Sequence, residues 1–292
     1  DTNPANNSDV DTDDLSPRAD LEITKTDHIS VLQGLTGASA LAASPDGTAV
    51  YATGLTGDGV AAFTRTPATG ALTFVESERD SVAGVDGLNG AAAVIVSGDG
   101  AQVYVAGSAD NALVAFSRDA ATNELTLLEL ERNGFGGVTG LLGPDGLALS
   151  SDGRHLYAAA AGSSSVAIFG RDANAASATF GELDFLGEVR DGVGGADGLN
   201  LARGLALSPD DAHLYVVGEA DNAVAVFARS DVSGALTFVQ FLRDGVAGVS
   251  GLSGPRAVAV SPDGGQVYVA SGTGNAVALF TRACDGGEIA SC

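Results

Sequence analysis

Apolar and polar residues alternate with a period of two along most of the chain, in short runs separated by turn residues. In the run Ala223–Phe227, for example, small and large apolar side chains alternate. This period predicts β-strands, because successive side chains of a strand point to opposite faces of its sheet. The residues between the runs are typical of turns, as in Ala220–Asn222. The pattern therefore predicts an all-β fold.

The strand pattern belongs to a repeat that occurs five times. Each copy has a turn of the type Ser-Pro-Asp-Gly, and these turns begin at Ser44, Ser97, Ser150, Ser208 and Ser261, so that successive copies are 53, 53, 58 and 53 residues apart. Proline and glycine at these places favour a type I turn. One tyrosine follows each turn, at Tyr51, Tyr104, Tyr157, Tyr215 and Tyr268. A Phe-x-Arg step comes next, with its arginine at Arg65, Arg118, Arg171, Arg229 and Arg282.

Each copy contains four predicted strands. Examples are an apolar run before the turn (Ala257–Val260), the tyrosine strand (Gln266–Ala270), the strand that ends at the Phe-x-Arg step (Ala223–Phe227) and a more polar strand (Leu72–Glu78). A lone four-stranded sheet cannot bury both faces, whereas copies stacked in a ring leave no face bare. We therefore expect a five-bladed β-propeller of four-stranded antiparallel blades over residues 21–292, preceded by an acidic tail, residues 1–20.

The closure of the ring has two interpretations. The fifth copy supplies three strands and then runs out at Cys292, while Leu21–Thr26 alternates like a fourth strand ahead of the first copy. We expect this N-terminal strand to complete the last blade through main-chain hydrogen bonds. In the alternative, Gly287–Ser291 forms the fourth strand, and Leu21–Thr26 pairs with a neighbouring subunit and builds a filament. The residues that we single out in the N-terminal strand are Leu21, Ile23 and Lys25.

The chain is strongly acidic, with 14 Lys and Arg against 37 Asp and Glu and a formal net charge of −23. Such a surface repels nucleic acid and anionic lipid, because phosphate contacts need clustered basic residues. It suits a saline or calcium-rich exterior. No apolar run is long enough to span a membrane. The start at Asp1, without a leader, fits a secreted product from which a signal peptide has been removed. We therefore expect an extracellular protein, in which Cys284 and Cys292 form a disulfide.

The N-terminal tail contains the most obvious metal-ligating pattern. Asp9, Asp11, Asp13 and Asp20 resemble the spacing of a calcium loop, which places hard oxygen ligands on one side of a turn. Asp14 stands where such a loop has glycine, and Asp20 stands where it closes with glutamate. The alternative is a solvated acidic leader.

The repeat also resembles a known family. Ser261–Gly264, Val267–Ala270 and Asn222–Phe227 are similar to the repeats of YVTN-type and lactonase-like β-propellers. This resemblance implies the fold. The lactonase-like group includes hydrolases of sugar lactones and muconate lactones, typically with seven blades, and other members that look like surface or secreted proteins. This chain departs from the enzymes in having five copies, and the matching residues are turn and core positions that carry no chemistry.

Histidines and arginines at repeated positions offer no clear catalytic group. His155 and His213 occupy a position that Ala49 and Gln102 fill in other copies, so we expect solvated strand residues there. Without a dedicated base, no Ser-His-Asp triad can be assembled. We expect the Phe-x-Arg arginines to pair with nearby carboxylates such as Asp119 and Asp172, and a second arginine set, Arg79, Arg132, Arg190 and Arg243, to brace neighbouring blades.

Long glycine-rich connections between copies, such as Gly84–Leu88, should gather at one mouth of the channel. Asp86 and Asp197 share a position in two of them, and we expect a small-molecule or ion site there. The leading functional interpretation is a secreted or cell-surface, non-catalytic binding module or structural subunit, with an extracellular protein or glycan as partner. One alternative is a lactonase-like hydrolase with metal or carboxylates at the channel mouth. Another is a filament subunit that polymerises through its N-terminal strand.

Overall fold

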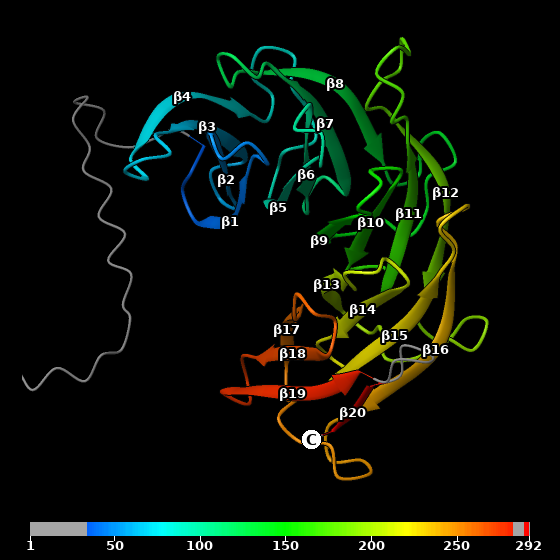
Figure 1. Ribbon diagram of the computed structural model, residues 1–292. Coiled ribbons are helices and arrows are strands. Elements are labelled where there is room, and N and C mark those ends of the chain that lie inside the picture. The colour runs from blue at the N-terminus through cyan, green and yellow to red at the C-terminus, as the bar shows by residue number, and fades with distance from the viewer. Residues whose placement is uncertain (1–33, 283–288, 292) are drawn as a thin grey trace, which may run out of the picture. The chain divides into compact units, whose positions relative to one another are not determined.

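The computed structural model describes residues 34–282 and 289–291. In this part of the chain twenty strands form five four-stranded antiparallel sheets, each built from consecutive strands (Figure 1). The described residues contain no helix, and hence none that is long and apolar enough to cross a membrane. The predicted all-β fold with four-stranded antiparallel sheets is confirmed.

The strand bounds follow the repeat closely. The first sheet contains β1 (Ala38–Ala43), β2 (Ala49–Gly54), β3 (Gly59–Arg65) and β4 (Leu72–Arg79). The second contains β5 (Ala91–Val96), β6 (Gln102–Gly107), β7 (Ala112–Arg118) and β8 (Leu125–Arg132). The third contains β9 (Pro144–Leu149), β10 (His155–Ala160), β11 (Ser165–Arg171) and β12 (Leu183–Arg190). The fourth contains β13 (Ala202–Leu207), β14 (His213–Gly218), β15 (Ala223–Arg229) and β16 (Leu236–Arg243). The fifth contains β17 (Pro255–Val260), β18 (Gln266–Ser271), β19 (Ala276–Arg282) and β20 (Ile289–Ser291).

The first strand of each sheet, here called the inner strand, contacts the inner strand of the next sheet, from β1 through β5, β9 and β13 to β17. The sheets pack face to face in chain order. The face that carries the tyrosine of one sheet packs against the face that carries the phenylalanine of the next, as Tyr215 and Val226 do against Val267 and Phe280. Four such core clusters join the five sheets in order. This is a propeller-like arrangement.

A closed ring of five blades is not what the described residues form. Tyr268 and Val277 lie on the tyrosine face of the fifth sheet and are 39% and 69% exposed, whereas Tyr215 at the equivalent place in the fourth sheet is fully buried. No core cluster among the described residues joins the fifth sheet to the first. The prediction of closure by five blades assumed that each copy would cover the face of its neighbour all the way round. Among the described residues, no sheet covers the tyrosine face of the fifth sheet.

The fourth strand of the fifth sheet comes from the C-terminal side of the chain. β20 pairs with β19 through Arg282↔Ile289, Thr281↔Ala290 and Phe280↔Ser291. The strand beside these three residues is therefore Ile289–Ser291, which lies within the alternative at Gly287–Ser291. Leu21–Thr26 lies outside the described residues, as do the aspartates of the tail and both cysteines, so their predicted roles stay predictions.

The Phe-x-Arg arginines brace neighbouring sheets, with partners other than those expected. The guanidinium of Arg118 is buried, and its Nη2 lies 3.0 Å from Oδ2 of Asp46, in the Ser-Pro-Asp-Gly turn of the preceding sheet. Arg171 pairs in the same way with Asp99, at 2.7 Å. The ion pairs thus do not use Asp119 and Asp172. Because the sheets stack, the end of the third strand of one sheet lies on the turn of the preceding sheet. The residues that are adjacent in sequence do not reveal this contact.

The histidine position belongs to the same brace. His155 is buried rather than solvated, and its Nδ1 lies 3.0 Å from Nη2 of Arg229. His213 is half-buried and makes the equivalent contact with Arg282. Burial, and then the charge of Arg229, lower the pKa of His155 below its ordinary value. The prediction of a solvated residue is wrong for His155, because this position lies beneath the arginine of the next sheet.

Candidate functional site

The second residue of each inner strand breaks the repeat. In chain order these residues are Ser39, Ala92, Asp145, Arg203 and Arg256. The position therefore changes from small or polar in the first two sheets to charged in the last three. A structural position tends to keep its residue type from copy to copy, whereas a site needs different groups from different copies. This makes the inner ends of β9, β13 and β17 a candidate site.

Asp145 pairs with Arg203 directly, and a fourth residue, Glu219, joins Arg203 to Arg256. Nη1 of Arg203 lies 3.0 Å from Oδ2 of Asp145, and its Nε pairs with Oε2 of Glu219. Nη2 of Arg256 lies 2.8 Å from Oε1 of Glu219. Glu219 also breaks the repeat, since Leu55, Ser108, Ala161 and Gly272 stand at its place in the other copies. We call Asp145, Arg203, Glu219 and Arg256 the inner charged cluster.

The backbone explains why these four side chains meet. Ala202 pairs with Gly218, and the backbone N–H of Glu219 donates to the carbonyl oxygen of Leu201 at 3.1 Å, so this turn residue lies across from the start of β13, within reach of the Arg203 side chain. The inner strands also approach closely, because Gly146 and Gly204 come after Asp145 and Arg203. A Cβ on Gly146 would collide with the carbonyl oxygen of Arg203. A Cβ on Gly204 would lie 2.6 Å from the carbonyl oxygen of Arg256. Glycine at these two places permits the approach that forms the cluster.

The inner charged cluster contains charges that ion pairs fix in place and one charge that is accessible to solvent. The side chain of Glu219 is 16% exposed, whereas that of Arg256 is 62% exposed. Partial burial opposes ionisation of Glu219, but Arg203 and Arg256 outweigh it and hold the pKa of Glu219 below its ordinary value. Burial likewise opposes the charge of Arg203, and the bonds to Asp145 and Glu219 outweigh it and raise the pKa of Arg203. The site therefore presents an ionised carboxylate and guanidinium groups, one of them open to solvent.

Such a set of groups has a definite chemical capacity. A guanidinium binds carbonyl and carboxylate oxygens through charge-assisted hydrogen bonds, and it stabilises negative charge that develops on a carbonyl oxygen. An ionised carboxylate accepts a proton from water. Hydrolysis of an ester bond can use both kinds of group.

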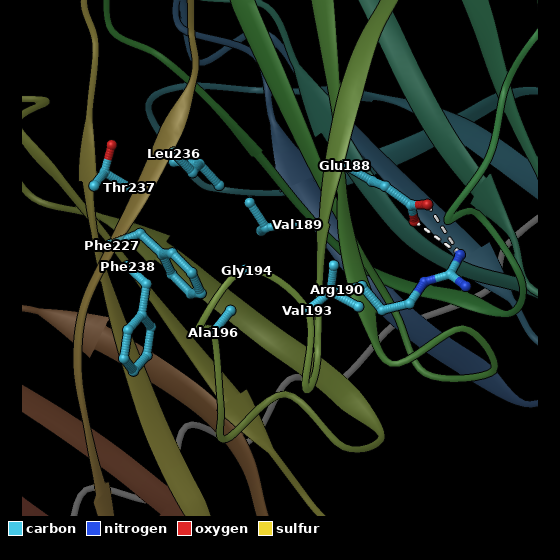
Figure 2. Close-up of a pocket in the computed structure, with 10 residues that line it drawn as sticks. All are labelled: Glu188, Val189, Arg190, Val193, Gly194, Ala196, Phe227, Leu236, Thr237 and Phe238. Carbon is cyan, nitrogen blue, oxygen red and sulfur yellow. Dashed lines mark hydrogen bonds and ion pairs between the residues drawn. The ribbon is translucent and has the colours of Figure 1, made fainter.

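A separate pocket lies between the third and fourth sheets, away from the inner strands. It has a volume of about 520 Å³. Figure 2 shows Val189 of β12 facing Leu236 and the rings of Phe227 and Phe238 in the fourth sheet. Its lining combines apolar side chains with backbone of the outer strands β12 and β16.

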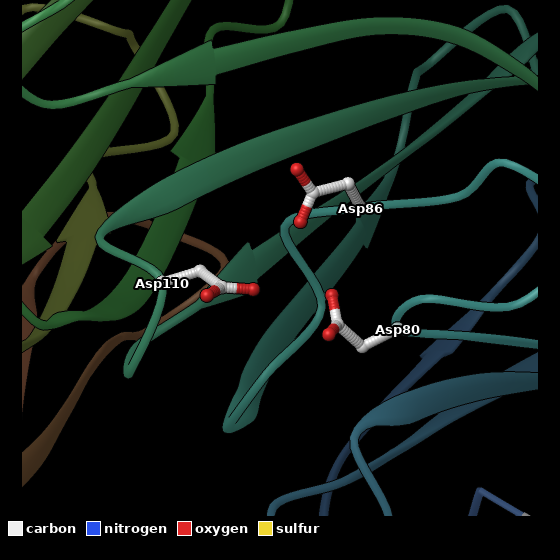
Figure 3. Close-up of side chains that lie close together, drawn as sticks. All are labelled: Asp80, Asp86 and Asp110. Atoms are coloured by element: carbon white, nitrogen blue, oxygen red, sulfur yellow. The ribbon is translucent and has the colours of Figure 1, made fainter.

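The aspartates predicted at the channel mouth each join two further aspartates. Asp86 lies with Asp80 and Asp110, as Figure 3 shows, with carboxylate oxygens within 4.8 Å of one another. Asp197 lies in the equivalent group with Asp191 and Asp221. Burial, and then the neighbouring charge of Asp80, raise the pKa of Asp110. The sequence shows the shared position of Asp86 and Asp197, but the four other aspartates come close to them only once the connections fold against the turns.

These groups have structural partners as well. Oδ1 of Asp80 accepts hydrogen bonds from the backbone N–H groups of Gly87 and Leu88, at 3.0 and 3.1 Å. Asn133 makes the equivalent bond to Leu141 without a charge. Arginines of the second repeated set also pair here, Arg132 with Asp86 at 3.0 Å and Arg243 with Asp197 at 3.3 Å. Three carboxylates suit a hard cation such as calcium, while the arginines already balance part of their charge.

Sequence reasoning missed the inner charged cluster entirely. The repeat is defined by the residues that its copies share, whereas Asp145, Arg203 and Arg256 stand at a position where the copies differ. The only sign of Glu219 in the sequence is that the other copies have a small or apolar residue at its position. The structure brings the four together because inner strands of three successive sheets begin side by side.

The chain is similar to known proteins in both sequence and structure. The model of a family described as "Lactonase, 7-bladed beta-propeller" matches residues 78–188 and 198–292, well over half of the chain. A search of curated proteins found no significant match. Among solved structures, the periplasmic gluconolactonase PpgL of Pseudomonas aeruginosa is 20% identical, with a TM-score of 0.70, over 87% of this chain and 70% of that one.

Two further solved structures are similar. A protein from Lactobacillus plantarum is 20% identical, with a TM-score of 0.70, over 90% of this chain and 72% of that one. A putative 6-phosphogluconolactonase from Bacteroides uniformis is 20% identical, with a TM-score of 0.68, over 86% of this chain and 69% of that one. At this identity the likeness shows the fold alone.

Proposed function

Because the chain belongs to the family of lactonase seven-bladed β-propellers, we propose that it hydrolyses a lactone at the inner charged cluster. The observation that carries this proposal is the break in the repeat, which places Asp145, Arg203 and Arg256 on successive inner strands around Glu219. The residues that brace the sheets, by contrast, recur from copy to copy. A charged set that departs from the repeat supports a role in chemistry.

Membership of this family overturns the expectation of a non-catalytic binding module or structural subunit. That expectation rested on the lack of a visible catalytic histidine and on a copy number of five. Ester hydrolysis needs neither, because a carboxylate can serve as the base and guanidinium groups can bind the carbonyl oxygen. The hydrolase alternative is therefore the interpretation that we retain.

The proposed step uses two kinds of group. Arg256, the exposed guanidinium, binds the carbonyl oxygen of the lactone. A water molecule attacks the carbonyl carbon, and the carboxylate of Glu219 takes the proton that this water loses. The bond between the carbonyl carbon and the ring oxygen then breaks, and the proton passes to that ring oxygen. The product is an open hydroxycarboxylic acid, with no atom or electron left over.

Substrate binding would itself prepare the base. Arg203 and Arg256 together hold the pKa of Glu219 below its ordinary value, which makes the free carboxylate a weak base. When Arg256 turns to the substrate, one of these cations is withdrawn and the pKa of Glu219 rises. Arg203 stays in place, because Asp145 holds its other nitrogen at 3.0 Å. The base would thus become stronger only when a substrate is present.

A test of the proposal follows the acid that ring opening releases. Glucono-δ-lactone is the probe, because two of the similar structures are described as a gluconolactonase and a putative 6-phosphogluconolactonase. In a pH-stat, the protein should release acid faster than buffer alone. Arg256→Ala should raise KM for the lactone by about tenfold, and Arg154→Ala, which removes another exposed arginine, should leave it unchanged. A wild-type rate equal to that of buffer would exclude this lactone activity.

We further propose that the two aspartate groups hold calcium, with a structural role. Three carboxylates lie close together in each group, and in one of them burial, and then the charge of Asp80, raise the pKa of Asp110. Calcium should raise the unfolding temperature of the wild type, by about 2–4 °C for each kcal/mol of binding free energy. The double change Asp86→Asn with Asp197→Asn should abolish that rise, while Asp231→Asn, at an exposed position, should preserve it. If calcium did not raise the unfolding temperature of the wild type, the proposal that these groups bind calcium would be wrong.

An extracellular location is part of the same proposal. A net charge of −23 suits a saline or calcium-rich exterior. Fractionation of the source cells tests it, since the protein should appear outside the cytoplasm.

A further inference from the structure

In three of the first four sheets, the outer strand carries a residue that bonds to the next sheet, and the exception is the third sheet. In the first sheet, Oε1 of Glu76 accepts a hydrogen bond from the backbone N–H of Leu125. In the second, Oε2 of Glu129 accepts one from the N–H of Leu183, at 2.6 Å. In the fourth, Nε2 of Gln240 donates to the carbonyl oxygen of Ile289, at 3.1 Å. The equivalent residue of the third sheet is Gly187, which has no side chain to make this bond.

The pocket of about 520 Å³ lies at this junction. Leu236, which occupies in the fourth sheet the place of Leu125 and Leu183, is one of its lining residues. A Cβ added to Gly187 would meet no atom within 4 Å, so a side chain at this position would begin in open space. The amides of Leu125 and Leu183 each donate to a glutamate of the preceding sheet. The third sheet offers no such carboxylate to the amide of Leu236.

The rest of the pocket is suited to an apolar body. Val189, Phe227, Leu236 and Phe238 line it together, and Val189 faces the two rings (Figure 2). Glu188 and Arg190 stand on the other side of the strand and pair with each other at 3.0 Å, so neither charge is left to attract a ligand by itself.

We propose that this pocket binds a small carboxylate with an apolar or aromatic body. The carboxylate of the ligand takes the place of the glutamate that Gly187 lacks, and it accepts the hydrogen bond from the amide of Leu236. The body packs against Val189, Phe227 and Phe238. This geometry is already present twice in the same chain, with Glu76 and Glu129 as built-in carboxylates. The pocket lies on outer strands, so it is separate from the inner charged cluster and does not depend on the proposed lactone hydrolysis.

The test uses phenylacetate as the probe and phenylacetamide as its neutral counterpart. Titration calorimetry on the wild-type protein should show phenylacetate binding with one site per chain. The amide should bind about tenfold more weakly, because it cannot supply a charge-assisted acceptor. No binding of phenylacetate, or equal binding of the two probes, would overturn the proposal.

Two substitutions place the binding in this pocket. Gly187→Glu supplies the missing carboxylate and should abolish binding. Because Gly187 has a φ of 145°, this variant carries backbone strain, and a second variant is needed. Val193 lines the pocket and is 60% exposed, so Val193→Asp should leave the fold intact. The new carboxylate should repel the ligand and lower the affinity for phenylacetate by about tenfold.

The matched control is Val246→Asp. Val246 occupies the equivalent position in the next connection and is 55% exposed, and it does not line the pocket. It should leave the affinity for phenylacetate at the wild-type value. If Val193→Asp and Val246→Asp changed the affinity equally, the charge of the whole protein would explain the effect and the proposed site would be wrong.

Discussion

Nη1 of Arg203 lies 3.0 Å from Oδ2 of Asp145, and the two residues occupy the same position in successive copies of the repeat. Two copies of one ancestral strand position thus carry opposite charges that bind each other. The pair fixes the guanidinium that in turn contacts Glu219. The inner charged cluster depends on this anchor.

Arg203→Ala should therefore damage catalysis more than binding. It leaves Asp145 and Glu219 as neighbouring carboxylates without a common cation and displaces the proposed base. We expect kcat for lactone opening to fall by about 100-fold, with a smaller change in KM, because the geometry of the base is lost. Steady-state kinetics measure both constants. A pure rise in KM with unchanged kcat would show that Arg203 only binds substrate.

His155 should make stability depend on pH near neutrality. Burial and the charge of Arg229 lower the pKa of His155 in the folded protein below the ordinary value of 6.5. A histidine with a lowered pKa stabilises the fold while it is neutral, so its contribution is full above the unfolded pKa and is lost as pH falls through the folded pKa. Urea unfolding should show the free energy of unfolding decline as pH drops below 6.5.

His155→Gln is the corresponding test variant. Gln102 occupies this position in the second sheet, where it accepts a hydrogen bond from Arg171, so glutamine should preserve the brace to Arg229. The variant should fold, and its free energy of unfolding should change less with pH in this range. An unchanged slope would show that other groups control the pH dependence.

The aspartates of the Ser-Pro-Asp-Gly turns should make the stability of the fold decrease in acid. Burial works against ionisation of Asp210, but hydrogen bonds from Ser208 and Arg282 lower its pKa to about 2 from an ordinary 3.8. The stability that this carboxylate contributes is full above 3.8 and is lost as pH falls toward about 2. Asp210→Asn should therefore lower the free energy of unfolding at neutral pH and reduce its decline in acid. Asp231→Asn, at an exposed site, should keep the wild-type profile.

The repeat predicted the strands because it is a local signal. Tyr51 and Phe116 alternate with small residues along single strands, and both are fully buried where the period of two places them. The partner of Arg118 was not predicted, because it is Asp46 in the preceding sheet, and that contact exists only after the sheets stack. The burial of His155 depends on the same stacking.

The candidate site was harder to predict for a different reason. Asp145 and Arg203 are 58 residues apart in the sequence, and no motif connects them. Their contact follows from the side-by-side inner strands β9 and β13. The exposed tyrosine face of the fifth sheet was likewise invisible in the repeat, since Tyr268 has the same sequence setting as the buried Tyr215. A repeat defines what its copies share, and both the site and the open face are differences between copies.

The most direct test of the account is kcat for the opening of glucono-δ-lactone by Glu219→Gln, measured beside the wild type and Arg154→Ala. Glutamine keeps the size of the side chain and a hydrogen-bond acceptor for Arg203, but it cannot take a proton from water. Glu219→Gln should lower kcat by about 100-fold or more, while Arg154→Ala matches the wild type. If Glu219→Gln opened the lactone at the wild-type rate, the inner charged cluster would not be the site of hydrolysis.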